Sequence, residues 1–146
     1  MTTLTRTRDL AAPPASVWAT LADFDALALW ADDIDHSSLT TEQREGVGTT
    51  RRVQMGQITL IERVIAWEPD HRLAYEIDGL LPIVKSATNT WTLTPTADGT
   101  LVSLATSVDT GKRPDKALIG AGIARKMAEA SDMMLDGLAA HLEDLS

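Results

Sequence analysis

The longest regular pattern of apolar residues spans residues 114–143 and predicts one long helix. Pro114 opens the segment, and proline is favoured at the first position of a helix. Such a helix is about 45 Å long, which is more than a domain of this size needs to close its core. Apolar side chains recur at steps of three and four residues, which places them on one helix face; they are Ile119, Ile123, Met127, Ala130, Met134 and Leu138.

Shorter runs before this helix alternate between apolar and polar residues, as half-buried β-strands do. Asp98-Gly99 lies between two such runs and is a strong hairpin pattern. Because the other connections are also short, neighbouring strands are expected to run antiparallel, as a meander. The predicted strands cover residues 3–10, 49–55, 58–67, 73–78, 87–94 and 101–109, and residues 34–41 are a weaker candidate.

Two short helices are expected between the first strand and the meander, over residues 17–24 and 27–30. Pro13 and Pro14 end the first strand, and Ser16 is a suitable N-cap. The order of elements indicates an α+β domain with its helices on one face of an antiparallel sheet. A sheet of this length curls strongly, so a long helix laid in its concave side leaves room for a cavity.

Length and composition indicate a single globular domain over residues 1–146. The chain has no cysteine and a formal net charge of −8, which excludes thiolate chemistry and argues against a nucleic-acid partner. Arg51-Arg52 and Lys112-Arg113 are interpreted as a solvated strand end and a solvated loop. No apolar run is long enough for a membrane span and no secretory signal is found, so a cytoplasmic location is expected.

Several short motifs, in this order of elements, resemble a known superfamily. They are Val17-Trp18, Trp30, Gly46-Val47-Gly48-Thr49, Glu62-Arg63-Val64, Trp67-Glu68-Pro69, Leu73-Ala74-Tyr75 and Asp98-Gly99-Thr100. Over its whole length the chain resembles the polyketide cyclase/dehydrase-like branch of the START/Bet v 1 (SRPBCC) superfamily. The resemblance implies a helix-grip fold, in which a curled antiparallel sheet of about six or seven strands surrounds a long C-terminal helix. It does not assign the function, because the family includes lipid and steroid carriers, aromatases and cyclases.

The alternation within strands selects the side chains that face the expected cavity. Arg51 and Val53 share one face of their strand. In residues 58–67 either face fits the pattern. The resemblance favours Glu62 and Val64 as inward residues, and a bulge in the strand would reverse that choice.

Polar residues interrupt the apolar rows of three predicted strands, at Tyr75, Asn89 and Thr106. A mainly apolar pocket with a few placed polar groups is typical of a small-molecule site. We therefore expect a small hydrophobic molecule, such as a lipid or polyketide, to bind between sheet and helix. The expected contacts are Trp30, Arg51, Val53, Glu62, Tyr75, Asn89, Trp91, Leu104, Thr106, Ile119, Ile123 and Met127.

An enzyme of the cyclase, aromatase or dehydratase type is the alternative, using the same cavity. His36 and Glu62 are the candidates for proton transfer, because the resemblance places the segment of His36 at the cavity edge. Glu62 with Arg51 or Arg63 is either a buried pair that shapes the pocket or a surface pair between strands. The histidines lack metal-ligand spacing and no nucleotide fingerprint occurs, so neither a metal nor a cofactor is expected.

Gly120-Ala121-Gly122 weakens the long helix, because each glycine costs about 1 kcal/mol of helix propensity. The resemblance places this segment at the cavity mouth, so residues 119–123 are predicted to form a mobile gate. A module that binds a partner through the outer face of the sheet is a third hypothesis. Both a monomer and a homodimer are compatible with the sequence.

Overall fold

The structure, a computed structural model, describes residues 1–112 and 114–145. It confirms the predicted order of elements, with bounds that lie within two residues of those expected for the strands and the long helix. The elements are β1 (Thr2–Leu10), α1 (Pro14–Ala22), the 3₁₀ helix η1 (Phe24–Leu29), β2 (His36–Leu39), β3 (Thr50–Met55), β4 (Ile58–Glu68), β5 (Arg72–Asp78), β6 (Ser86–Pro95), β7 (Thr100–Asp109) and α2 (Pro114–Leu145).

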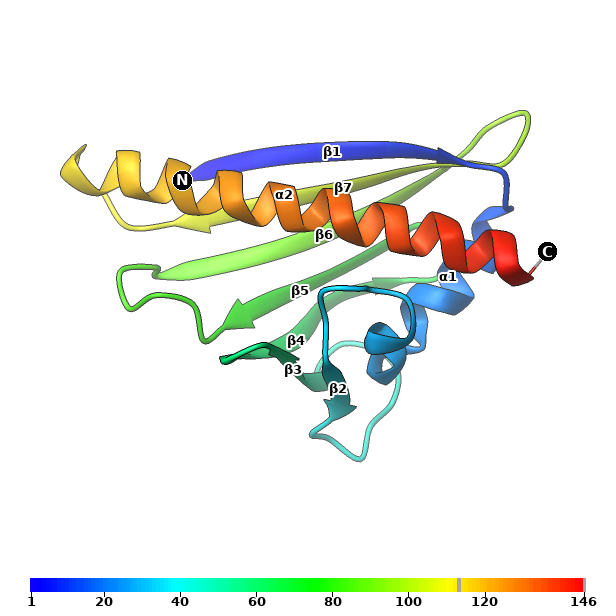
Figure 1. Cartoon of the computed structure of the whole chain (residues 1–146), viewed down its shortest axis with the longest axis horizontal. Coiled ribbons are helices and arrows are strands. Elements are labelled where there is room, and N and C mark those ends of the chain that lie inside the picture. The colour runs from blue at the N-terminus through cyan, green and yellow to red at the C-terminus, as the bar shows by residue number, and fades with distance from the viewer. Residues whose placement is uncertain (113, 146) are drawn as a thin grey trace.

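Within the described residues the strands form one seven-stranded sheet in the order β1-β7-β6-β5-β4-β3-β2. Every neighbouring pair is antiparallel. The first strand returns to pair with the last, so the sheet is a meander extended by one strand from the N-terminus. It curls beneath α2, which runs across the molecule along β1 and β7 (Figure 1). This arrangement confirms the helix-grip fold.

The start of α1 differs from the prediction. Ser16 lies inside the helix, whose N-cap is Pro13 and whose first residue is Pro14. The reason is that proline has a fixed φ and lacks an N–H, so it fits the first helical position without losing a hydrogen bond. Pro13 keeps the extended backbone of a cap residue, with φ −67° and ψ 156°.

The buried stripe of α2 also differs from the prediction in its first half. In that half the small residues Ala124 and Ala128 are buried, whereas Ile119 is 47% exposed. Small side chains let the helix backbone approach the strands closely, so the larger apolar residues are displaced to its flanks. The buried residues of α2 are Gly120, Ala124, Ala128, Ser131, Met134, Leu135, Gly137, Leu138, Ala139 and Leu142, so the predicted Met134 and Leu138 are buried in its second half.

A β-bulge in β4 resolves which face of this strand points inward. The pairing with β5 shifts between Val64 and Ala66. Before the bulge, Glu62 and Val64 are buried. After it, Trp67 turns to the same side and packs edge-on against Trp18, with ring centres 5.2 Å apart. Both patterns that the sequence allowed are therefore present, one on each side of the extra residue.

Candidate functional site

A buried ion pair lies on the concave face of the sheet. Arg51 and Glu62 are direct partners on β3 and β4, and Arg51 Nε lies 2.8 Å from Glu62 Oε1. Arg51 Nη1 also donates to the carbonyl oxygen of Phe24, at 2.9 Å. The guanidinium carbon lies 3.8 Å from the centre of the Phe24 ring and 4.8 Å from that of Tyr75. Arg51 therefore fastens η1 to the sheet.

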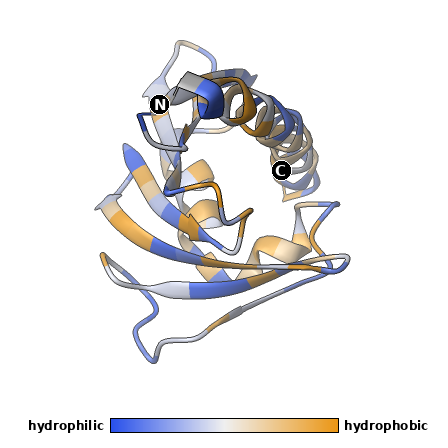
Figure 2. Ribbon diagram, turned by 90° about the vertical axis from the view of Figure 1, so that its left-hand side faces the viewer, coloured by the Kyte–Doolittle hydropathy of each residue, from blue (hydrophilic) through white to orange (hydrophobic). Residues whose placement is uncertain are grey.

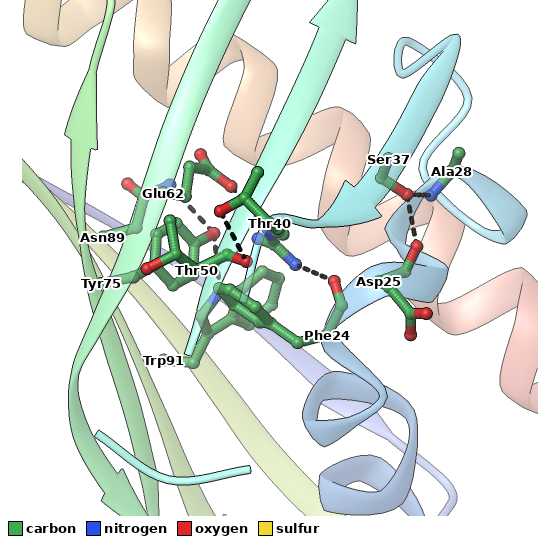
Figure 3. Close-up of polar contacts among 11 residues, drawn as sticks. Phe24, Asp25, Ala28, Ser37, Thr40, Thr50, Glu62, Tyr75, Asn89 and Trp91 are labelled. Atoms are coloured by element: carbon green, nitrogen blue, oxygen red, sulfur yellow. Dashed lines mark hydrogen bonds and ion pairs between the residues drawn. The ribbon is translucent and has the colours of Figure 1, made fainter. Parts of the chain in front are cut away.

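Tyr75, which the Arg51 guanidinium contacts, begins a chain of hydrogen bonds toward α2. Figure 3 shows Tyr75, Asn89 and Trp91 beside Glu62. Tyr75 Oη accepts from Asn89 Nδ2 and from Trp91 Nε1, each at 3.3 Å. Thr106 Oγ1 donates to Asn89 Oδ1 at 2.7 Å and lies 3.3 Å from Ser131 Oγ on α2. We call Arg51, Glu62, Tyr75, Asn89, Trp91, Thr106 and Ser131 the concave-face network.

Tyr75 keeps its phenolic proton in this network. Burial raises the pKa of Tyr75, and the nearby carboxylate of Glu62 raises it further. The oxygen accepts two hydrogen bonds, whereas no group among the described residues accepts one from the Tyr75 O–H. Tyr75 is therefore a buried, neutral hydrogen-bond donor.

A groove lies at the C-terminal end of α2, and we call it the end groove. Its volume is about 740 Å³, within the range of small-molecule sites. It lies between the end of β1, the α1–η1 pair and the last turns of α2. Buried apolar residues form its floor, and Leu29 and Leu145 are exposed at its rim. Its apolar lining consists of Leu10, Ala11, Ala12, Pro13, Ala19, Ala26, Leu29, Trp30, Ala139, Leu142 and Leu145.

Trp30 joins the end groove to the concave-face network. It lines the groove and packs edge-on against Trp91, with ring centres 6.1 Å apart. Trp91 in turn donates to Tyr75. The indole N–H of Trp30 is buried and has no acceptor among the described residues, which is a costly state for a polar group.

Carboxylates lie on the polar side of the end groove, at Asp9, Asp23 and Glu143. Burial raises the pKa of Asp23, and a hydrogen bond with the Asp25 side chain raises it further. Asp25 is itself paired with Arg44, at 2.9 Å. Arg8 and His141 line the groove as well, so it combines an apolar floor with a polar edge of both charge signs.

The structure brings most of the predicted ligand contacts together. Eight of them lie side by side on the concave face and are buried: Arg51, Val53, Glu62, Tyr75, Asn89, Trp91, Leu104 and Thr106. Of the predicted contacts, Trp30 alone lines the end groove. Met127 is partly buried against the core, Ile123 is half-buried and Ile119 lies on the exposed flank of α2. The gate at residues 119–123 stays a prediction.

His36 does not lie at the cavity edge. It is exposed and pairs with Gln54, whose neighbour across the next strand is Thr59. Glu62 pairs with Arg51, and Arg51 and Gln54 face opposite sides of β3 because an odd number of steps separates them. Glu62 therefore points to the face of the sheet opposite to that of His36. The two proton-transfer candidates are thus separated by the sheet.

Several residues of the site were missed from the sequence. Ser131 is the polar member of the buried stripe of α2, and only the corrected stripe identifies it. The groove residues Leu10, Ala139 and Leu142 come from the two ends of the chain, where no local pattern relates them. Among the described residues, no group of three acidic or histidine side chains is arranged to hold a metal ion, and no described helix is long and apolar enough to cross a membrane.

Known proteins share both sequence features and the fold. The family described as polyketide cyclase/dehydrase and lipid transport matches residues 1–143. Uncharacterised proteins of Mycobacterium tuberculosis and Mycobacterium bovis are 40% identical over 73 residues, which is 49% of this chain and 44% of theirs. The match therefore spans less than half the length of these curated relatives.

Two solved structures illustrate the shared fold. A START superfamily protein from Mycobacterium smegmatis superposes with a TM-score of 0.78 and 15% identity, over 99% of each chain. The Zhui aromatase/cyclase from Streptomyces sp. R1128 superposes with a TM-score of 0.74 and 23% identity, over 97% of this chain and 93% of that one. From the family match over nearly the whole length, the chain belongs to the polyketide cyclase/dehydrase and lipid transport family.

Proposed function

We propose that the protein binds a small hydrophobic molecule in the end groove, against Trp30. The observation that carries the proposal is an apolar groove of about 740 Å³ whose floor is backed by the concave-face network. The description of the family, which includes lipid transport, supports this class of ligand. Binding gains about 25 cal/mol for each Å² of apolar surface removed from water.

The concave-face network holds the floor of the groove in place. Trp91 fixes Trp30 by ring contact, and Arg51 holds the backbone at Phe24, where η1 begins. Apart from the Tyr75 O–H, the polar side chains of the network bond to one another, and Trp30 lies between the groove and Trp91. The predicted contacts on the concave face remain a second candidate position for the ligand, deeper than the groove. An acceptor on the ligand that reaches the Trp30 N–H would satisfy it.

A tryptophan placed in the groove is expected to block binding. Ala19 is exposed on α1 and lines the groove, whereas Ala15 is exposed on the same helix and does not line it. N-phenyl-1-naphthylamine, a neutral apolar fluorophore, is the probe. We expect Ala19→Trp to weaken its saturable binding at least about tenfold, since lost apolar contact of about 1.4 kcal/mol has this effect. Ala15→Trp is the matched control and should bind as the native protein does.

The same titration separates the two positions of the ligand. If Ala19→Trp binds normally while Trp91→Ala, on the concave face, binds weakly, the ligand occupies the deeper position and the groove assignment is wrong. If the native protein shows no saturable binding of apolar probes, hydrophobic-ligand binding itself is refuted.

A cyclase or aromatase activity is the second candidate, and one observation favours it. Tyr75 offers an unpaired O–H close to the Glu62–Arg51 pair, which suits donation to a carbonyl oxygen of a poly-β-keto substrate. Positioning of the substrate would supply much of the rate. The similarity in fold to the Zhui aromatase/cyclase is compatible with this activity.

Tyr75→Phe is expected to lower turnover of a poly-β-ketone about 100-fold, as loss of a general acid does. Formation of aromatic product is followed by absorbance, at a temperature where circular dichroism shows the variant folded. His36→Ala is the control, because His36 lies on the outer face. Equal turnover by Tyr75→Phe and the native protein would remove Tyr75 from the chemistry.

A further inference from the structure

The cations of this acidic protein are distributed unevenly. All four lysines of the chain lie either just before β6, at Lys85, or around the first turns of α2, at Lys112, Lys116 and Lys126; Arg125 lies beside the last of them. Among the described residues, none of these five side chains makes an ion pair. The arginines elsewhere that are paired with a carboxylate are Arg6, Arg8, Arg44, Arg51, Arg63 and Arg72.

Tertiary contacts bring Lys85 next to the start of α2. The Lys85 N–H donates to the Asp109 carbonyl oxygen, at 2.7 Å, and the Lys85 side chain packs over Gly111. Thr110 Oγ1 donates to the Lys116 carbonyl oxygen, at 3.0 Å. The loop between β5 and β6 and the start of α2 therefore lie side by side, at the left of Figure 1 and facing the viewer in Figure 2.

Apolar side chains are exposed at the same end. Leu118 is 83% exposed and Ile119 is 47% exposed on the first turns of α2. Leu81, in the loop between β5 and β6, is 59% exposed. We call these three residues, with Lys85, Lys112, Lys116, Arg125 and Lys126, the basic–apolar end.

We propose that the basic–apolar end docks on the surface of a lipid bilayer that contains anionic lipids. Unpaired cations are attracted to the negative surface potential, and exposed aliphatic side chains enter the boundary between headgroups and acyl chains. Nucleic acid rewards cations alone, so the exposed Leu118 and Leu81 favour lipid.

The sign of the charge limits the docking surface to this end. Beyond Lys126 the chain has no further lysine or arginine. The exposed acidic residues of α2 there include Glu129, and Asp132 and Asp136, which pair with Arg6 and Arg8, so this part of the helix offers no unpaired lysine or arginine to an anionic surface. The helix is therefore expected to meet the bilayer by its first turns and not along its length. The end groove lies at the other end of α2, so docking is independent of ligand binding there.

Co-sedimentation with vesicles tests the proposal. We expect the native protein to bind vesicles of equimolar phosphatidylglycerol and phosphatidylcholine and to bind phosphatidylcholine vesicles weakly, with affinity that falls as salt rises. Lys112→Gln with Lys126→Gln should weaken binding about 25-fold, at about fivefold per lysine. Arg52→Gln with Arg63→Gln removes two exposed cations from the outer face of the sheet and should leave binding unchanged.

The apolar part is tested by Leu118→Ser, which should weaken vesicle binding at all salt concentrations while keeping its salt dependence. Equal loss in the two double variants, or absence of binding to anionic vesicles, would overturn the proposal. Binding to a DNA duplex at the same salt without vesicle binding would assign the surface to nucleic acid instead. Titration of the lysine variant with N-phenyl-1-naphthylamine should be normal, so failure of docking is distinguishable from failure of ligand binding.

Discussion

Glu62→Leu is expected to destabilise the protein by about 3–5 kcal/mol, because it leaves Arg51 charged and buried without its partner. The side chains of Arg51 and Glu62 are only 4% and 6% exposed, so water cannot replace the lost carboxylate. The guanidinium also bonds the Phe24 carbonyl, and its displacement would loosen η1. Urea denaturation followed by tryptophan fluorescence measures the change in the free energy of unfolding.

The double variant Arg51→Met with Glu62→Leu is the control for this prediction. Replacement of a buried ion pair by apolar residues is often neutral, so the double variant should recover most of the loss. A deficit of about 1–3 kcal/mol is expected to remain, since the Phe24 carbonyl loses its donor. The single variant Arg51→Met completes the comparison. If the double variant loses as much free energy of unfolding as the two single variants together, Arg51 and Glu62 do not act as a pair.

Gly137→Ala is expected to destabilise the protein by about 3 kcal/mol through overpacking. A β-carbon at this position would lie 2.1 Å from the carbonyl oxygen of Trp30. The contact is with backbone, which cannot rotate away as a side chain can, so α2 must move off η1. Because Trp30 lines the end groove, the affinity for N-phenyl-1-naphthylamine should fall as well. Thermal unfolding and the dye titration measure the two effects.

Gly122→Ala is the matched control on the same helix. Apart from its chain neighbours and the nearby backbone of α2, no atom of the described residues lies within 4 Å of the position that its β-carbon would take. The substitution should therefore stabilise α2 by up to about 1 kcal/mol, the difference in helix propensity. Equal effects of the two substitutions would show that contact with η1 does not determine the cost at Gly137.

Most of the fold was predictable because its signals are local. Alternation identified the strands and the step of three and four residues identified α2, so their bounds were found within two residues. Burial of Tyr75, Asn89 and Thr106 followed from strand parity. The interpretation of Arg51-Arg52 as a solvated strand end was wrong for Arg51, which is buried because it shares the inward face of β3 with Val53 and pairs with Glu62. The sheet face was predictable wherever the strand was regular.

The predictions for the buried stripe of α2 and the inward face of β4 were incomplete because contacts between distant parts of the chain competed with the local pattern. The stripe of Ile119 and Ile123 is more apolar than that of Gly120 and Ala124, yet the sheet buries the smaller residues because close backbone approach favours them. The bulge at Ile65 has no sequence marker and reverses the inward face of β4 before Trp67.

The sequence by itself determined the order of elements, the α+β class and the family, because each follows from periodicity and short motifs along the chain. Only the tertiary structure decided which distant groups meet. It paired Arg51 with Glu62 in the core, placed His36 on the outer face, formed the end groove from both ends of the chain and gathered the lysines at the opposite end. The physical reason is that contact between groups remote in sequence depends on strand register and helix rotation, which packing of the whole core sets.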